Sequence, residues 1–119
     1  MVKVVILVEI VQLLKALADE TRIRILNLLT NGELCVCDLE AGLDIQQSNA
    51  SRHINKLKTA GIIVSKKKSP WVYYRYNEDI FLRYPFLTMI IKDEVSKSGV
   101  CQQDQMRLQK HKAHGNSCD

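Results

Sequence analysis

Residues 46–76 read QQSNASRHINKLKTAGIIVSKKKSPWVYYRY and combine two patterns with different periods. Over 46–60 the apolar residues recur at helical spacing, and Gly61 follows at the position where a left-handed backbone suits glycine. The runs 62–68 and 71–76 are rich in β-branched and aromatic residues and flank a Ser-Pro pair. The stretch therefore predicts a helix followed by a two-stranded β-hairpin.

The chain before this stretch predicts further helices. Residues 2–17 are mostly apolar and predict a buried helix or strand. Asp19 is a candidate N-cap for a helix over 20–29, which an Asn-Gly pair then ends. A short helix fits 37–43, and with the helix over 46–60 it makes a helix-turn-helix candidate.

The chain after the hairpin predicts one last amphipathic helix over 79–97 and a polar, mobile tail over 98–119. The expected fold is thus mainly α with one β-hairpin, a winged helix-turn-helix in domain 1–97. The length of 119 residues suits one small domain whose stability depends on oligomerisation.

The charge is distributed unevenly along the chain. The net charge is only +4, yet residues 46–76 hold seven Lys or Arg and no Asp or Glu. The other residues carry ten basic against thirteen acidic side chains. One strongly basic segment in an otherwise acidic chain is typical of a nucleic-acid surface. No nucleophile with a base partner, phosphate loop or carboxylate pair stands out, which argues against an enzyme.

The helix over 46–60 predicts a DNA-reading surface. At about 100° per residue its apolar side chains gather on one side and hydroxyl, amide and guanidinium groups on the other. In a winged arrangement the basic hairpin would contact phosphates. The expected DNA-binding residues are Gln47, Ser48, Asn49, Ser51, Arg52, His53, Asn55, Lys56, Lys66, Lys67, Lys68 and Arg75.

Some of these residues have a second interpretation. The polar face of the helix is also compatible with simple solvation, and a packed structural role for His53 is as well supported as a phosphate contact. Trp71 and the hairpin tyrosines suit either base stacking or cross-strand packing.

Two cysteines, Cys35 and Cys37, lie at the start of the short helix. The apolar run at the amino terminus is interrupted by Glu9 before it could serve as an export signal or membrane span, so we expect a cytoplasmic protein without membrane contact. In that reducing compartment thiols act as ligands or sensors, and a helix N-terminus would lower their pKa. The alternative is a pair of small buried residues.

Three motifs resemble the ArsR/SmtB family of metal-responsive repressors. Residues 33–39 (ELCVCDL) are similar to its metal-binding box, 17–26 (LADETRIRIL) to the opening of its second helix, and 47–54 (QSNASRHI) to its recognition helix. The resemblance covers roughly residues 10–78. It implies a homodimer built from the first and last helices, which binds a palindromic operator and is released when an ion binds Cys35 and Cys37.

The resemblance leaves the ion and its third ligand open. Where some arsenic sensors have a third cysteine this chain has Glu40, so Cys101 is the first choice, with Cys118, a thiol cofactor or no third thiol as alternatives. Residues 1–34 contain no Cys or His, which favours As(III) or Sb(III) over Cd(II), Pb(II) or Zn(II). His111 and His114 are candidates for a second, zinc site. A thiol redox switch and an ion-blind nucleic-acid-binding module are the competing functions.

Overall fold

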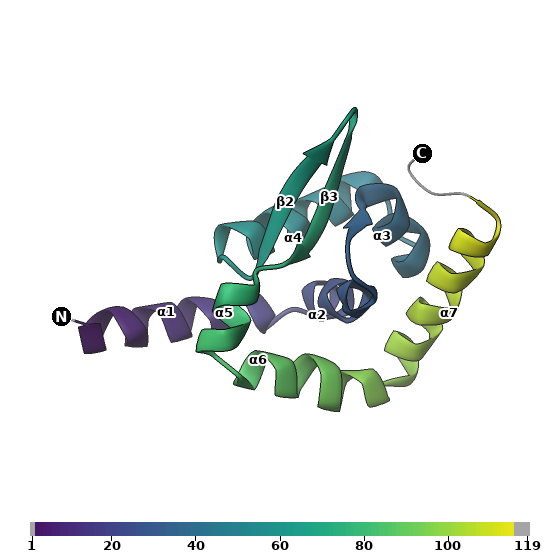
Figure 1. Cartoon of the computed structure of the whole chain (residues 1–119). Coiled ribbons are helices and arrows are strands. Elements are labelled where there is room, and N and C mark those ends of the chain that lie inside the picture. Colours follow the sequence, from purple (N-terminus) through teal and green to yellow (C-terminus); the bar gives the residue numbers. More distant parts are fainter. Residues whose placement is uncertain (1, 116–119) are drawn as a thin grey trace.

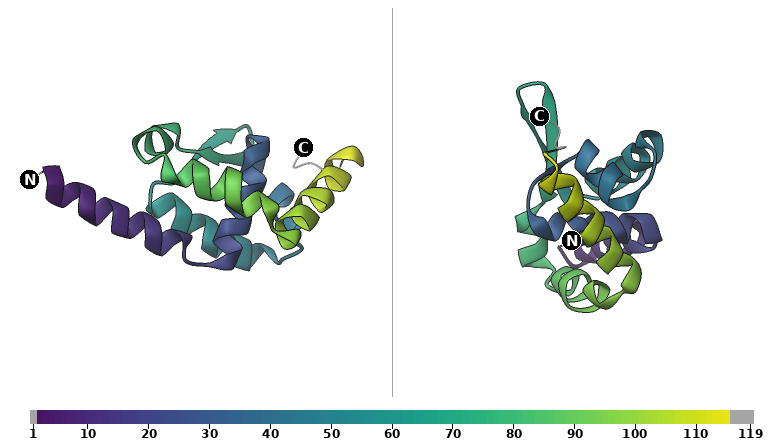
Figure 2. Two further views of the ribbon diagram at one scale, coloured as in Figure 1. Left: turned by 90° about the horizontal axis from the view of Figure 1, so that it is seen from below. Right: turned by 90° about the vertical axis from the view of Figure 1, so that its right-hand side faces the viewer.

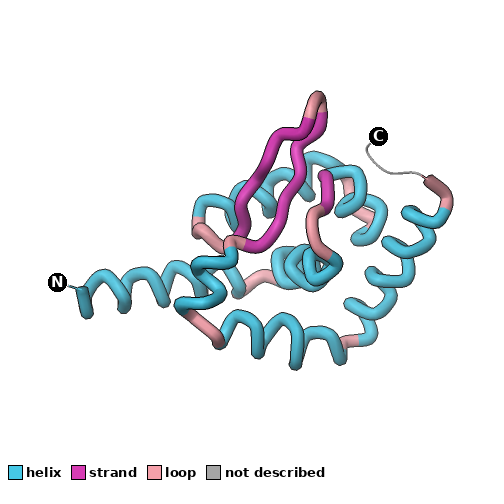
Figure 3. The backbone as a smooth tube through the Cα atoms, viewed as in Figure 1, coloured by secondary structure: helices cyan, strands magenta, loops and turns pink. Residues whose placement is uncertain are grey.

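A computed structural model describes residues 2–115, which are mostly helical with a small antiparallel sheet (Figures 1 and 3). Two 3-10 turns (η1 and η3) and a π-helical segment (η2) join some of the α-helices. The elements are α1 (Val2–Leu17), α2 (Glu20–Leu28), η1 (Leu29–Asn31), β1 (Leu34–Cys35), α3 (Val36–Leu43), α4 (Gln47–Thr59), β2 (Ile63–Lys68), β3 (Trp71–Tyr76), α5 (Glu78–Arg83), α6 (Phe86–Thr88), η2 (Met89–Glu94), η3 (Val95–Lys97) and α7 (Gly99–Ala113).

Helices α3 and α4 form the predicted helix-turn-helix, and α2 packs against both of them around one core. Asp19 caps α2, because its carboxylate accepts a hydrogen bond of 3.0 Å from the backbone N–H of Arg22. The core side chains Leu26, Leu39 and Leu57 have no exposed surface. Burying each contributes about 1.5–3 kcal/mol.

Two special backbone positions shape the helix-turn-helix. Gly61 follows α4 at φ 81°, as its place after the helix predicted. Gly42 lets α3 approach α2 closely, since a Cβ there would lie 2.6 Å from Cδ1 of Leu28. Gly61 thus ends α4, and Gly42 sets the spacing of α3 and α2.

The predicted hairpin forms the wing, and a third strand joins it. The sheet order is β1-β3-β2, with all pairs antiparallel. The turn at Ser69 has a positive φ of 57°. Strand β1 was not predicted, because two residues are too few to show a period. It pairs Cys35 with Tyr73 and so ties the residue before α3 to the wing.

Helix α1 extends from the rest of the molecule as an arm (Figures 1 and 2). The prediction of a helix at this place is confirmed, but that of a buried one is wrong for the single chain. Val5 and Leu7 are 61% and 63% exposed, whereas Leu13 and Leu17 near the carboxyl end of α1 are buried. The arm therefore offers an apolar face that no other part of residues 2–115 covers.

The prediction of one helix over 79–97 is wrong. α5 ends at Arg83, and Tyr84 adopts a non-helical backbone with φ −125° and ψ 80°. The physical reason is Pro85, which lacks an N–H group and disfavours a helical backbone at the preceding residue. The chain resumes as α6, η2 and η3, so one helix becomes four short segments.

The prediction of a mobile tail after residue 97 is also wrong for the described part. α7 packs against α2 and α3, with Cys101, Asp104 and Leu108 buried. The Asp104 carboxylate is fully buried and accepts two hydrogen bonds of 2.8 Å from Arg24. It also accepts one from Arg107. Residues 116–119 of the predicted tail lie outside the described residues.

A membrane span is not expected from the described helices. None of the helices within residues 2–115 combines the length and the apolar character needed to cross a bilayer.

Candidate nucleic-acid interface and thiol site

Helix α4 presents the predicted polar face. Its apolar residues Ala50, Ile54 and Leu57 are at most 1% exposed and face the core. Asn49 and Ser51 are half-buried, and the Arg52 guanidinium donates a hydrogen bond of 2.9 Å to the Asn49 side-chain oxygen. The fully accessible members of the predicted set on this helix are Gln47, Ser48, Arg52, Asn55 and Lys56. The burial pattern expected from helical spacing is thus confirmed, whereas contact with DNA stays a prediction.

His53 is the exception among the predicted DNA-binding residues. It is only 4% exposed, and its Nδ1 lies 3.2 Å from Nη1 of Arg22 and 3.6 Å from Oδ1 of Asp19. Burial, which disfavours the charged ring, lowers the pKa of His53. This burial supports the packed structural role, in which His53 joins α4 to the amino end of α2, and its contact with a phosphate stays a prediction.

The wing carries the other predicted phosphate contacts. Lys66, Lys67, Lys68 and Arg75 are all exposed on the hairpin, which projects away from the helices (Figure 1). Lys68 forms an ion pair with Glu33, just before β1, and this hydrogen bond lowers the pKa of Glu33. One of the four basic groups of the wing is thus already paired with a carboxylate.

The two thiols lie where β1 meets α3. Cys35 is the N-cap of α3, with an extended backbone at φ −89° and ψ 172°, and its side chain is 1% exposed. Cys37 lies in the first turn of α3, is half-buried and is a free thiol. Cys35 is disulfide-bonded, so a role as a thiolate ligand requires its reduction.

The pKa of Cys37 is raised, whereas its place at a helix N-terminus predicted a lowered one. Burial raises the pKa of the Cys37 thiol, and the nearby carboxylates of Glu40 and Asp38 raise it further. Burial and the two carboxylates thus outweigh the backbone hydrogen bond that lowers the pKa of Cys37. Cys37 reacts as a thiolate only after losing its proton at a higher pH, or to an incoming ligand.

Asp38 and His111 form a contact that was not predicted. The sequence did not point to Asp38, and it pointed to His111 only as a partner of His114. One Asp38 oxygen accepts a hydrogen bond of 3.1 Å from the backbone N–H of Cys35. The other lies 3.2 Å from Nε2 of His111 on α7. Asp38 therefore links the thiol site to the carboxyl-terminal helix. No signal in the sequence reveals this contact, because 73 residues separate its partners.

Cys101 is not brought to the other two cysteines. It lies in the first turn of α7, where its carbonyl accepts a hydrogen bond of 3.2 Å from Asn27. Ten residues of helix, or about 15 Å, separate it from His111, the α7 residue beside Asp38. Across residues 2–115 no group of three or more His, Cys, Asp or Glu side chains is placed to hold a metal ion.

The other proposed ligands are not assembled either. His111 contacts Asp38, while His114 is exposed at the carboxyl end of α7, so the structure does not bring the two histidines together as a zinc site. Cys118 lies outside the described residues.

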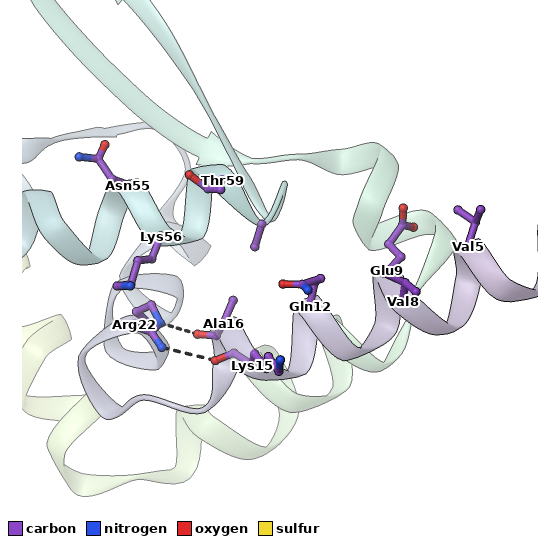
Figure 4. Close-up of a pocket in the computed structure, with 11 residues that line it drawn as sticks. Val5, Val8, Glu9, Gln12, Lys15, Ala16, Arg22, Asn55, Lys56 and Thr59 are labelled. Carbon is purple, nitrogen blue, oxygen red and sulfur yellow. Dashed lines mark hydrogen bonds between the residues drawn. The ribbon is translucent and has the colours of Figure 1, made fainter.

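Two cavities border these sites. A cavity of about 240 Å³ has Cys35 in its wall and lies between the wing and the start of α4. A larger open groove of about 960 Å³ separates α1 from the carboxyl half of α4 (Figure 4). Arg22 lines this groove and donates hydrogen bonds to the carbonyls of Ala16 and Lys15, which hold the end of α1 in place (Figure 4).

Comparisons with known proteins agree with this architecture. Residues 19–65 match the model of the bacterial regulatory proteins of the arsR family. The chain is 48% identical over 71 residues to the arsenical resistance operon repressor of Escherichia coli, which covers 59% of this chain and 61% of that repressor. The chain thus spans less than two thirds of the length of this relative.

Two further proteins widen the comparison. The chain is 37% identical over 82 residues to the cadmium resistance transcriptional regulatory protein of Listeria innocua, over 68% of this chain and 69% of the relative. The fold is similar to the homodimeric winged helix-turn-helix DNA-binding domain of a possible ArsR-family regulator from Mycobacterium bovis. The TM-score is 0.66 at 24% identity, over 82% of this chain and 91% of that domain.

Proposed function

Because this chain belongs to the ArsR family of bacterial regulatory proteins, we propose that it is an arsenite- or antimonite-responsive repressor of transcription. It binds double-stranded operator DNA as a homodimer in the cytoplasm and leaves the DNA when the trivalent metalloid binds Cys35 and Cys37. The observation that carries the proposal is the position of the thiols. Cys35 pairs with Tyr73 of the wing, and Cys37 lies in the first helix of the helix-turn-helix.

The DNA-binding part of the proposal is supported by the accessible faces of α4 and the wing. Arg and Asn side chains in the first turns of a recognition helix match guanine and adenine edges in the major groove. Arg52 and Asn49 occupy such positions on α4. The exposed basic side chains of the wing suit phosphates, which set the register and carry most of the salt dependence.

The homodimer is supported by the uncovered face of α1. Val5, Leu7 and Val8 are more than half exposed, and Val11 and Leu14 are 39% and 48% exposed on the same helix. An apolar helix face of this kind is typical of a protein–protein interface. A two-fold dimer would present two α4 helices to half-sites about one helical turn of DNA apart.

The choice of ion follows from the thiols that the chain offers. Trivalent arsenic takes sulfur ligands, and Cys35 and Cys37 supply two of them. Cys101 lies at the other end of α7, so the third position falls to Cys118, water or a small thiol. Cadmium, lead and zinc are the alternatives, and the cadmium regulator of Listeria innocua shows that such a function occurs among the relatives.

Ion binding is coupled to DNA through β1. Cys35 has an extended backbone and Cys37 a helical one, so we expect their joint coordination to rearrange residues 35–37. That change strains the pairing of Cys35 with Tyr73 and the ion pair of Glu33 with Lys68, and both lead to the wing. The coupling is reciprocal, so bound DNA weakens ion binding by the same factor.

The test is ion-dependent DNA release in a fully reduced protein. A duplex selected from a random library by the ion-free protein is titrated with arsenite, antimonite, cadmium, lead and zinc in a phosphine reductant. We expect arsenite to release the parent and Cys101→Ser proteins, and to leave Cys35→Ser and Cys37→Ser on the DNA. Cys101→Ser is the matched control because it removes a thiol away from the pair.

Three outcomes contradict the proposal in different ways. Release by arsenite from Cys35→Ser places the site elsewhere. Release by cadmium alone assigns the protein to the cadmium regulators. Release only by an oxidant, with no effect of any ion under reduction, identifies a thiol redox switch.

A further inference from the structure

The carboxyl end of α7 carries a second basic segment, which the proposed function does not use. Residues 105–115 hold Arg107, Lys110 and Lys112 together with two histidines, and no Asp or Glu. Lys110 and Lys112 are exposed, and within residues 2–115 neither amino group lies within 4.0 Å of a carboxylate oxygen. The helix dipole places only about half a negative charge at this end, so the two lysines leave it net positive.

Contacts with α3 place this basic end of α7 beside the elements that face DNA in the proposed complex. Nε2 of His111 lies 3.2 Å from Oδ1 of Asp38 in the first turn of α3. Val36, which begins the same helix, shares the wall of the smaller cavity with Gln47 of α4 and Trp71 of the wing. The last turn of α7 therefore lies next to the place where the recognition helix and the wing meet. It also lies on the side of the molecule toward which the wing projects (Figures 1 and 2).

Two carboxylates border the start of α3, and both already have a basic partner. Asp38 is buried and faces His111, whereas Glu33 forms an ion pair with Lys68 of the wing. Since these acidic groups are engaged, they do not neutralise the two exposed lysines of α7. The positive charge at this end remains available for an anionic ligand.

The place of α7 in the proposed dimer indicates which anion this is. Helix α7 lies at the opposite end of the molecule from α1 (Figure 1). Because the proposed dimer forms through α1, its two α7 helices would lie at the outer ends. The anionic groups there are the DNA phosphates that flank the two half-sites. Phosphate contacts fix the position of a protein on DNA and carry no direct sequence information.

We propose that the carboxyl end of α7 is a third DNA-contacting element, in which Lys110 and Lys112 bind backbone phosphates outside each half-site. Two residues at this spacing point to different sides of a helix, but in the last turn their flexible stems reach past the helix end. The inference rests on the proposed function, because it needs the same DNA complex. It extends the DNA-binding surface beyond α4 and the wing.

The test is the salt dependence of DNA binding by the reduced, ion-free protein. Anisotropy titrations use the duplex selected from a random library, at salt concentrations between about 50 and 200 mM. The double variant Lys110→Gln with Lys112→Gln should lower the salt slope by about two units. It should also weaken binding at about 0.1 M salt by tenfold or more. Replacing both lysines by arginine keeps the charges and should keep the parent slope.

Lys92→Gln with Lys97→Gln is the matched control, because it removes the same charge from exposed residues of η2 and η3, away from the wing (Figure 1). It should change the slope by less than about half a unit. Hydroxyl-radical footprinting locates the contacts. The parent should protect sugars outside each half-site that the Lys110→Gln, Lys112→Gln protein leaves reactive, while the central footprint stays the same.

The outcomes separate this inference from the function on which it rests. A fall in slope of less than about one unit, or an equal fall in the Lys92 and Lys97 control, overturns the inference. Identical footprints of the parent and the Lys110→Gln, Lys112→Gln protein overturn it as well. All three results leave a DNA-binding repressor standing and assign the basic end of α7 to another acidic partner. A parent protein that binds no duplex overturns the proposed function itself.

Discussion

Replacing Asp104 of α7 by asparagine should strongly lower the free energy of unfolding. The carboxylate is fully buried and faces Arg24, which donates from Nε to Oδ2 and from Nη2 to Oδ1 at 2.8 Å each. Arg107 also donates to Oδ1. Asparagine has nearly the same shape but no charge. The variant therefore removes the ion pair while keeping the packing of α7.

The expected loss follows from the environment of Arg24. Its side chain is 17% exposed and keeps one other hydrogen bond, of 3.1 Å, to the carbonyl of Leu43. Leaving a buried charge without its partner costs about 3–5 kcal/mol. A protein of this size has a total free energy of unfolding of about 5–15 kcal/mol. The change should lower Tm by roughly 12–20 °C.

Urea unfolding followed by circular dichroism, at one fixed protein concentration, measures the change. Asp93→Asn is the matched control, because Asp93 is exposed and should change the free energy of unfolding by less than about 0.5 kcal/mol. The double variant Arg24→Met with Asp104→Leu should recover most of the loss, because the one charge that it leaves unpaired, on Arg107, is 38% exposed to water. A loss below about 1 kcal/mol in Asp104→Asn would refute the view that this ion pair fixes α7 to α2.

Three further predictions concern the wing, the helix packing and the buried histidine. Glu33→Gln frees Lys68 for a phosphate, so DNA affinity should rise and the salt slope steepen by about one unit; an unchanged slope in anisotropy titrations would count against this. Gly42→Ala places a methyl group against Leu28 and should cost about 1–3 kcal/mol in urea unfolding, whereas a neutral effect would show that α3 and α2 can separate. The lowered pKa of His53 means that the fold favours the neutral ring. The stability that the neutral ring contributes is present above the unfolded pKa of about 6.5 and is lost as pH falls through the folded pKa. His53→Gln should therefore flatten the fall of Tm between pH 7 and 5. Equal slopes of Tm against pH in the parent and the variant would contradict a buried, neutral His53.

Most of the helix-turn-helix follows from short-range patterns. The burial of Ala50, Ile54 and Leu57 repeats with the period of a helix, and Gly61 ends that helix with a positive φ. Asp19 acts on an N–H group three residues away. Such features depend on neighbours within about one turn, so they can be recognised in a sequence without knowledge of the rest of the fold.

The thiol site and its surroundings depend on contacts that no local pattern contains. Strand β1 exists because β3 pairs with it. Helix α7 has no regular apolar pattern, because one of its buried positions is Asp104 and not an apolar residue. That carboxylate is stable in the core only because Arg24, 80 residues earlier, neutralises it.

The same dependence decided which cysteines can act together. The spacing of Cys35 and Cys37 placed both at the junction of a strand and a helix, but only the packing of α7 put His111 beside Asp38 and Cys101 beside Asn27. Periodicity and capping are properties of consecutive residues, so the sequence contains them in full. Distances between remote side chains are set by how the helices pack, and they required the tertiary structure.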